Sequence, residues 1–239
     1  MTLPPLDTRL LIFDVFGTVV DWRGSIAREA AETAGPRGVK IDPEAFADRW
    51  RAGYRPAMDR VRKGELPWMN IDTLHRRILD EMLPQFGLDA LSERERDHLN
   101  RAWHRLDPWP DSVAGLTRLK AKFVIATLSN GNVALLTNMA KHAGLPWDCV
   151  LSAELFHHYK PDPESYLGAA AMLGVKAGET MMVAAHEDDL IAARAAGLRT
   201  AFVRRPLEFG ARPGYDPPRE RGFDFVADDF VDLARQLGV

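Results

Sequence analysis

The order of predicted elements is the strongest constraint on the fold. Residues 9–15 form an apolar run that predicts a buried strand, whereas residues 22–106 contain helix-like segments and no convincing strand. From about residue 107 onward, strand patterns alternate with helix patterns. Such alternation indicates parallel strands joined by right-handed crossovers. We therefore expect an α/β core made of residues 1–21 and 107–239, interrupted after its first strand by an all-helical insert at 22–106.

Local signals place the individual elements. Asp42 and Pro43 supply an N-cap and a first-turn proline, and Ser92 with Glu95 forms a capping-box pattern. The Arg-, Pro- and Gly-rich stretch 204–222 predicts a surface loop whose charges are solvated. The insert is expected to contain helices at 23–34, 43–62, 69–83 and 93–105. The core is expected to contain strands at 123–128, 149–151, 180–185, 200–203 and 224–226 and helices at 132–143, 162–173, 188–196 and 229–237.

Composition excludes several classes of protein. The net charge of −3 gives no nucleic-acid footprint, and the single cysteine, Cys149, excludes an intrachain disulfide framework or a Cys-x-x-Cys zinc site. The N-terminus has neither the basic nor the apolar region of a signal peptide, and no apolar run reaches the length of a membrane span. We therefore expect a cytoplasmic protein that binds neither nucleic acid nor membranes.

Polar residues follow four of the predicted core strands. Asp14 ends the first, Ser129 and Asn130 end the second, Lys160 lies just beyond the third, and Asp189 follows the fourth. Each alone has a structural explanation, such as a helix cap, a turn or a solvated charge. Together, at the edge of a parallel sheet where ligands bind, they predict one active-site crevice.

This set resembles the haloacid dehalogenase (HAD) superfamily, whose motifs are Asp-x-x-x-Thr, Ser/Thr, Lys and an acid. The matching residues are Asp14 with Thr18, then Ser129, Lys160 and Asp189. The resemblance covers nearly the whole chain, because this superfamily places its cap after the first strand. It implies a Rossmann-like HAD core with a parallel sheet and a helical cap.

Phe16 separates the chain from most of that superfamily. Magnesium-dependent phosphatases of the superfamily carry a second Asp at this position, which protonates the leaving alcohol. A halide needs no proton, so the resemblance is to the type II, or L-2-haloacid, dehalogenase branch, where this position is aromatic. Trp50-Arg51 and Tyr166 also resemble that branch, and Asp21-Trp22-Arg23 resembles its members that act on haloacetates.

The resemblance implies hydrolysis of short 2-haloalkanoic acids to 2-hydroxy acids through an ester on Asp14, with no metal or organic cofactor. Lys160 would keep Asp14 ionised, Asp189 would orient water, and Thr18 would orient Asp14 or Lys160. A haloacid is the implied partner, and nothing in the chain settles whether it forms a homodimer. The residues expected to bind substrate or halide are Val15, Phe16, Arg51, Ser129, Asn130, Tyr166 and His186, with His186 taken as a wall of the pocket and a base role as the minority alternative.

One departure leaves alternatives open. Glu187 and Asp188 stand where relatives carry an amide and an aromatic residue, and two extra acids are unfavourable beside an anionic substrate unless they are neutralised or turned away. Asp188 and Asp189 could instead ligate Mg²⁺. The competing hypotheses are a magnesium-dependent phosphatase and a catalytically idle protein that uses the same fold for binding.

Overall fold

A six-stranded sheet forms the centre of the computed structural model, which describes residues 7–211 and 222–239. Its strand order is β5-β4-β1-β6-β7-β8, and every neighbouring pair is parallel. The strands are β1 (Leu10–Phe13), β4 (Val124–Ser129), β5 (Cys149–Ser152), β6 (Thr180–Ala184), β7 (Arg199–Val203) and β8 (Phe225–Ala227). The predicted α/β fold with a parallel sheet is confirmed.

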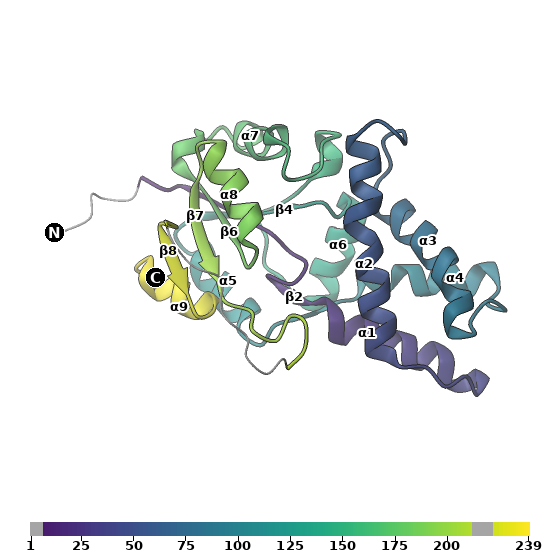
Figure 1. Cartoon of the computed structure of the whole chain (residues 1–239). Coiled ribbons are helices and arrows are strands. Elements are labelled where there is room, and N and C mark those ends of the chain that lie inside the picture. The colour runs from purple at the N-terminus through teal and green to yellow at the C-terminus, as the bar shows by residue number, and fades with distance from the viewer. Residues whose placement is uncertain (1–6, 212–221) are drawn as a thin grey trace.

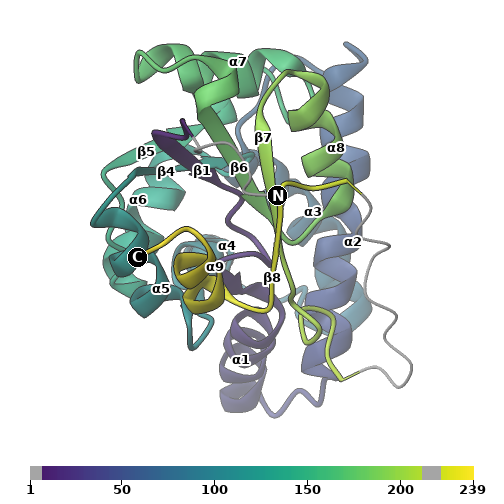
Figure 2. The ribbon, with the colours of Figure 1, turned by 90° about the vertical axis from the view of Figure 1, so that its left-hand side faces the viewer.

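Helices cover both faces of this sheet (Figure 2). Successive side chains of a strand point to opposite faces, so Leu10 and Ile12 pack into one hydrophobic cluster and Leu11 and Phe13 into the other. The cluster of Leu10 includes residues of α7 (Pro163–Met172) and α8 (Glu187–Ala195). The cluster of Phe13 includes residues of α5 (Ser112–Lys120), α6 (Val133–Ala143) and α9 (Phe230–Gln236). Burial on both faces explains why β1 reads as an uninterrupted apolar run.

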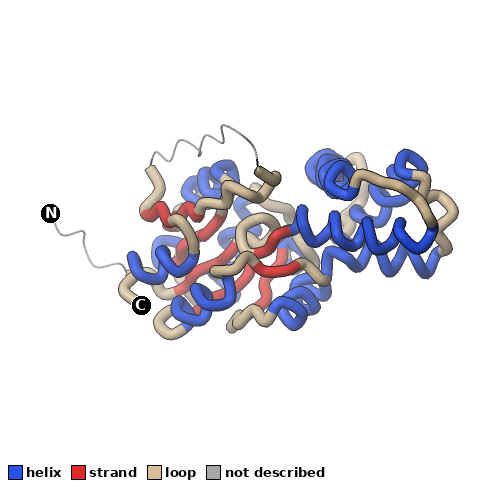
Figure 3. Tube along the Cα trace, turned by 90° about the horizontal axis from the view of Figure 1, so that it is seen from below, coloured by secondary structure: helices blue, strands red, loops and turns tan. Residues whose placement is uncertain are grey.

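Four helices between β2 and β3 form a separate group, which we call the helical lobe: α1 (Trp22–Ala34), α2 (Pro43–Arg62), α3 (Ile71–Met82) and α4 (Glu93–Asn100). Figures 1 and 3 show the lobe on one side of the sheet, opposite the C-terminus. Asp42 caps α2 by accepting from the backbone N of Ala45 at 3.0 Å, and the capping box of Ser92 and Glu95 is present. The lobe therefore contains the four helices expected from the sequence, with shorter ends at α3 and α4.

A two-stranded ladder was not predicted. Strand β2 (Val20–Asp21) pairs antiparallel with β3 (Asp107–Pro108), at the points where the chain enters and leaves the helical lobe. Two residues are too few to show an alternating pattern, so this ladder depends on the tertiary fold. Helix α5 was also absent from the expected set, although it packs against α9 beneath the sheet.

The prediction of a solvated loop over residues 204–222 was wrong for its first part. Arg205 is 8% exposed and Glu208 only 3% exposed, and both side chains bind groups of the core. Arg205 donates from Nε to the backbone O of Thr18 at 2.8 Å and pairs through both terminal nitrogens with Asp111. Charged and turn-forming residues are typical of a surface loop in a sequence. No local pattern reveals that the groups they bind lie far away in the chain. Residues 212–221 of the predicted loop lie outside the described residues.

Membrane insertion was not expected from the sequence. Among the described helices, none combines the length and the apolar character that crossing a bilayer requires.

Candidate active site

A cavity of about 340 Å³ lies where the carboxyl ends of the central strands face α2. Figure 1 shows α2 running between the sheet and helices α3 and α4 of the lobe. The cavity combines the polar strand ends of the core with one face of a lobe helix. It is lined by Asp14, Phe16, Arg51, Tyr54, Arg55, Met58, Asp59, Arg62, Asn130, Lys160, Pro161, Tyr166, His186, Asp188, Asp189 and Phe209.

Asp14 follows β1 directly and is buried at the floor of the cavity. Its Oδ1 accepts a hydrogen bond from Nζ of Lys160 at 2.9 Å, and its Oδ2 accepts one from Oγ1 of Thr18 at 2.8 Å. Nδ1 of His186 lies 3.1 Å from the same Oδ2. Both oxygens are therefore fixed in direction by donors from separate segments of the core.

These contacts determine the charge of Asp14. Burial opposes ionisation, but the charge of Lys160 and the hydrogen bond from His186 outweigh it and hold the pKa of Asp14 far below its ordinary value of 3.8. The pKa of Lys160 is raised despite burial, because its ammonium lies between Asp14 and Asp189. The floor of the cavity consequently holds an ionised carboxylate at neutral pH.

Lys160 links Asp14 to the fourth predicted motif. Its Nζ donates to Oδ2 of Asp189 at 2.5 Å, and the hydroxyl of Tyr166 donates to Oδ1 of Asp189 at 2.6 Å. Burial raises the pKa of Asp189, and the neighbouring charge of Asp14 adds to that rise. Both oxygens of Asp189 thus accept hydrogen bonds, and Tyr166, which also lines the cavity, supplies one of the donors.

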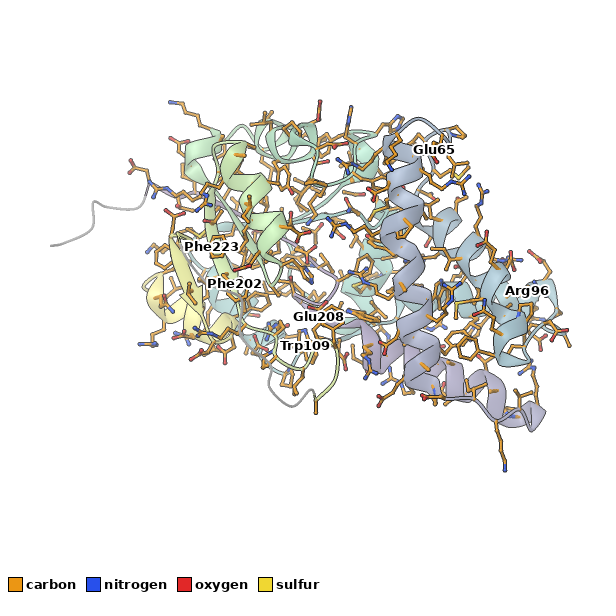
Figure 4. The ribbon with its side chains drawn as sticks, in the orientation of Figure 1. Glu65, Arg96, Trp109, Phe202, Glu208 and Phe223 are labelled. Carbon is orange, nitrogen blue, oxygen red and sulfur yellow. The ribbon has the colours of Figure 1, made fainter. Side chains whose placement is uncertain are left out.

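His186 connects Asp14 to a residue that the sequence did not suggest. Its Nε2 lies 3.0 Å from Oε1 of Glu208, on the segment after β7 (Figure 4). Burial disfavours the imidazolium, but Glu208 and Asp14 stabilise it more strongly and raise the pKa of His186 to about 10. The imidazole is therefore positively charged at neutral pH and lies between two carboxylates.

Arg51 faces the cavity from α2 within an aromatic cage formed by Phe16, Trp22 and Tyr54. The guanidinium carbon lies 4.4 Å from the ring centre of Tyr54, 5.4 Å from Trp22 and 5.9 Å from Phe16. Within the described part of the chain, the buried Nη1 of Arg51 has no hydrogen-bond partner. Burial raises the pKa of Tyr54 to about 12, so its phenol is neutral. A buried donor without a partner, on a residue that lines the cavity, is suited to binding an anion.

The other predicted binding residues divide into two groups. Phe16 and Asn130 line the cavity, and Oδ1 of Asn130 accepts from the backbone N of Lys160 at 2.7 Å. Ser129 is fully buried and its Oγ accepts from the backbone N of Gly131 at 3.1 Å. Neither Ser129 nor the buried Val15 is among the residues that line the cavity. Thr18 also lies behind it, where its Oγ1 accepts from the backbone N of Ala185 at 2.9 Å.

The two unexpected acids do not place two unpaired charges in the cavity. Asp188 lies at the cavity wall and forms an ion pair with Arg55, with 3.2 Å between its Oδ2 and Nη1. Glu187 is not among the lining residues. The positive charge needed to neutralise Asp188 therefore comes from Arg55 of α2, the residue after Tyr54.

The cavity wall from α2 was largely missed. The part of the cavity wall that α2 supplies consists of Arg51, Tyr54, Arg55, Met58, Asp59 and Arg62. Their separations of three and four residues place them on one face of a helix. Once Arg51 was a candidate, this spacing was the signal that could have identified the others. Glu208 had no comparable signal, because its partner Trp22 is 186 residues away in sequence.

A metal site was the weaker sequence hypothesis for the acids. Over residues 7–211 and 222–239, no group of three or more His, Cys, Asp or Glu side chains has the arrangement to hold a metal ion.

Comparisons with known proteins identify the family of the chain. Residues 8–197 match the model of the haloacid dehalogenase-like hydrolases. The (S)-2-haloacid dehalogenase 4A of Burkholderia cepacia is 31% identical in an alignment of 220 positions that covers 87% of this chain and 87% of the relative. The structure of the defluorinating L-2-haloacid dehalogenase Rha0230 superposes with a TM-score of 0.94 and 48% identity, covering 97% of this chain and 96% of that one.

A third match carries a bound reactant. The L-2-haloacid dehalogenase of Xanthobacter autotrophicus with chloropropionic acid covalently bound has a TM-score of 0.80 and 25% identity, over 96% of this chain and 98% of that one. The family model and these relatives each span most of the chain. The chain therefore belongs to the haloacid dehalogenase-like hydrolases, and the three relatives described above are (S)-2-haloacid or L-2-haloacid dehalogenases.

Proposed function

We propose that this protein hydrolyses the carbon–halogen bond of short 2-haloalkanoic acids, such as haloacetates and 2-halopropionates, to give 2-hydroxy acids. The observation that carries the proposal is the ionised carboxylate of Asp14 at the floor of a small cavity, with Phe16 in place of a second acid. The relatives named (S)-2-haloacid and L-2-haloacid dehalogenases support it.

In the first half-reaction, Asp14 attacks the carbon that carries the halogen. The carbon–halogen bond breaks as the bond to Asp14 forms, so the product is an ester and a free halide. Lys160, Thr18 and His186 hold the attacking carboxylate in one orientation. The covalent chloropropionic acid in the Xanthobacter structure supports this route.

The departing halide would be bound by Arg51. Its unpartnered Nη1 offers a buried donor, and the aromatic cage keeps water from the anion. Asn130 and Phe16 line the same cavity and would complete the halide site. The substrate carboxylate would bind the main-chain amides that follow Asp14 at Val15 and Phe16, and Ser129 stays a predicted contributor. A volume of about 340 Å³ favours acids with short chains.

We further propose that residues 22–106 act as a cap on the core. The ladder of β2 and β3 joins the two ends of this segment, and ion pairs cross from α2 to the core. Arg62 lies 2.7 Å from Asp162, and Arg55 lies 3.2 Å from Asp188. Closure would exclude bulk water and place Arg51 over Asp14. A cytoplasmic location and a homodimer stay predictions.

A single turnover in ¹⁸O-water tests the covalent route. With enzyme in excess over chloroacetate, we expect the label to enter the carboxylate of Asp14, because water attacks the carbonyl carbon of the ester. Mass spectrometry of the peptide that contains Asp14 measures this incorporation. Label found only in the hydroxy acid would contradict an ester on Asp14.

Two controls separate the competing hypotheses. A phosphatase would hydrolyse phosphate esters and respond to Mg²⁺, whereas the proposed enzyme should release halide from haloacids without added Mg²⁺ and leave phosphate esters intact. A binding protein would do neither. Halide release from fluoro-, chloro- and bromoacetate and from each enantiomer of 2-chloropropionate would define the substrate range.

Replacing Arg51 by Lys should lower kcat/KM for chloroacetate by ~10²-fold, the scale of losing one charge-stabilising donor. Lys keeps the positive charge but lacks the planar fork that fills the aromatic cage. Initial rates of chloride release measure the effect, with Arg49→Lys on the exposed side of α2 as the matched control. Wild-type rates in Arg51→Lys would show that the halide does not bind here.

A further inference from the structure

His186 and Glu208 form a pair of charged groups beside the reacting carboxylate. Nδ1 of His186 lies 3.1 Å from Oδ2 of Asp14, and its Nε2 lies 3.0 and 3.1 Å from the two oxygens of Glu208. One ring nitrogen therefore faces the reacting centre while the other is held by a carboxylate. The same arrangement orients the histidine in Ser-His-Asp hydrolases.

Glu208 is built into the core. Its side chain is almost fully buried, and its Oε1 accepts a hydrogen bond from Nε1 of Trp22 at 3.1 Å. Gly17 has a φ of 82°, and a Cβ there would lie 2.1 Å from Oε1 of Glu208. Only glycine leaves room for this carboxylate beneath the turn that follows Asp14. Arg205 anchors the same segment to the backbone of Thr18 and to Asp111.

The second half-reaction of the proposed function requires proton transfers that the first half-reaction does not. When water hydrolyses the ester on Asp14, the group that leaves is the alkoxide of the hydroxy acid. An alkoxide needs a proton, and the attacking water must lose one. Phe16 occupies the position at which related phosphatases carry the acid for such transfers, so this chain must supply the proton donor from another residue.

We propose that His186, oriented by Glu208, is the acid–base catalyst of ester hydrolysis. The inference rests on the proposed function and concerns only its second half-reaction. His186 is the catalytic residue because its Nδ1 contacts the reacting carboxylate. Glu208 is a positioning residue, which holds the ring and its charge state from the opposite side.

Formation of the ester changes the surroundings of His186. In the free enzyme two carboxylates stabilise the imidazolium, which explains its pKa of about 10. The ester removes the charge of Asp14, so burial then opposes the imidazolium against Glu208 alone, and its pKa falls. The other charged groups that line the cavity are Arg51, Arg55, Asp59 and Arg62 of α2, Lys160, and Asp188 and Asp189 of α8. The loss of that charge makes release of the ring proton to solvent easier once the halide has left.

The remaining steps balance. Neutral His186 accepts a proton from water as the water oxygen bonds to Cγ of Asp14. The bond from Cγ to the alkoxide oxygen then breaks, and the imidazolium gives its proton to that oxygen. The carboxylic acid left on Asp14 passes its proton to His186, which restores both starting charges. Haloacid and water become hydroxy acid, halide and one proton in solvent.

The neighbouring groups are less suited to this role. Both oxygens of Asp189 already accept hydrogen bonds, from Lys160 and Tyr166. The ester leaves Lys160 facing the charge of Asp189, and its ordinary pKa of 10.5 lies far above the 6.5 of an imidazole, so Lys160 retains its proton. His186 is the group beside Asp14 whose charge state the ester itself alters.

Single-turnover kinetics of His186→Asn test the inference. We expect one equivalent of chloride per active site from chloroacetate, followed by an ester on Asp14 that persists and is visible as added mass on the intact protein. Ester hydrolysis should slow by ~10²–10⁴-fold, the usual contribution of an acid–base group. His142→Asn, at an exposed site on α6, is the matched control and should clear the ester at the wild-type rate.

Glu208→Gln supplies a second readout. Neutralising this carboxylate lowers the pKa of His186, so the rise of the ester-hydrolysis rate with pH should shift to lower pH. If the role of Glu208 were purely structural, the pH at which the rate of ester hydrolysis rises would not change. Glu29→Gln, which alters a half-buried carboxylate paired with Arg105 in the helical lobe, should leave the profile unchanged.

The possible failures are distinguishable. Wild-type protein that releases no halide from any haloacid would overturn the proposed function itself. If the wild type releases halide, two results would overturn only the role of His186. The first is ester hydrolysis at the wild-type rate in folded His186→Asn, and the second is a folded variant that never forms the ester. If His186→Asn does not fold, the test rests on Glu208→Gln. The role of His186 is then overturned if the ester-hydrolysis rate of Glu208→Gln rises at the same pH as that of the wild type.

Discussion

Replacing Asp14 by Asn should abolish hydrolysis of chloroacetate, with kcat reduced by ~10⁴-fold or more, the scale seen when a covalent nucleophile is removed. An amide is a far weaker nucleophile than a carboxylate, and no second acid lies at position 16 to replace it. Chloride release and the mass of the intact protein measure the loss of turnover and of the ester. The ¹⁸O label should also be absent from this position.

The fold should survive this substitution. In Asp14→Asn the amide oxygen can still accept a hydrogen bond, and Lys160 keeps its 2.5 Å contact with Asp189. Asp48→Asn, which alters the pairing with Arg23 in the helical lobe, is the matched control and should retain activity. Circular dichroism on both variants separates lost chemistry from lost structure. Halide release by folded Asp14→Asn at more than a small fraction of the wild-type rate would contradict the nucleophile assignment.

The positions of Asp14, Lys160 and Asp189 were predictable because strand ends are local in sequence. Asp14 follows β1, Lys160 lies beyond β5 and Asp189 follows β6, and parallel pairing across the sheet brings the ends of these strands to one edge. The structure places Asp14 and Asp189 on either side of a single ammonium, as that topology requires. Sequence pattern was sufficient here because chain direction and sheet order determine the geometry.

Glu208 and the aromatic cage could not be predicted in the same way. Glu208 reaches Trp22 and His186 from a segment whose composition resembles a solvated loop, and its burial depends on the glycine at position 17. Arg55 neutralises Asp188 across the gap between lobe and core. These contacts join residues far apart in the chain, and no local period or cap encodes them. The charge balance of the site is consequently a tertiary property.

Replacing Lys160 by Met should cost both activity and stability. The substitution leaves Asp14 and Asp189 buried without the ammonium that they share, and removing one partner of a buried ion pair costs ~3–5 kcal/mol. Activity should fall by ~10²-fold or more, because Asp14 loses the charge that keeps it ionised. Urea unfolding and chloride release measure the two effects, with Lys141→Met, exposed on α6, as the matched control.

The stability loss should depend on pH with a definite sign. In the wild type, the pKa of Asp14 lies below its unfolded value of 3.8, so its ionised form stabilises the fold above that pH. Without Lys160, burial instead raises the carboxyl pKa values, and the folded variant binds protons that the unfolded chain does not. The variant should therefore regain stability as the pH falls from ~8 to ~5, while the wild type shows no such gain from Asp14.

Comparing unfolding free energies across that pH range isolates the shared ammonium. A stability gap between wild type and Lys160→Met that stays constant with pH would show that the loss arises from packing of the lysine stem. A gap that narrows on acidification, and that also narrows when Asp189→Asn is added, would place the cost on the two buried charges. In that case the ammonium that helps keep Asp14 ready to attack also makes its burial tolerable, so reactivity and stability at this site depend on the same ion pair.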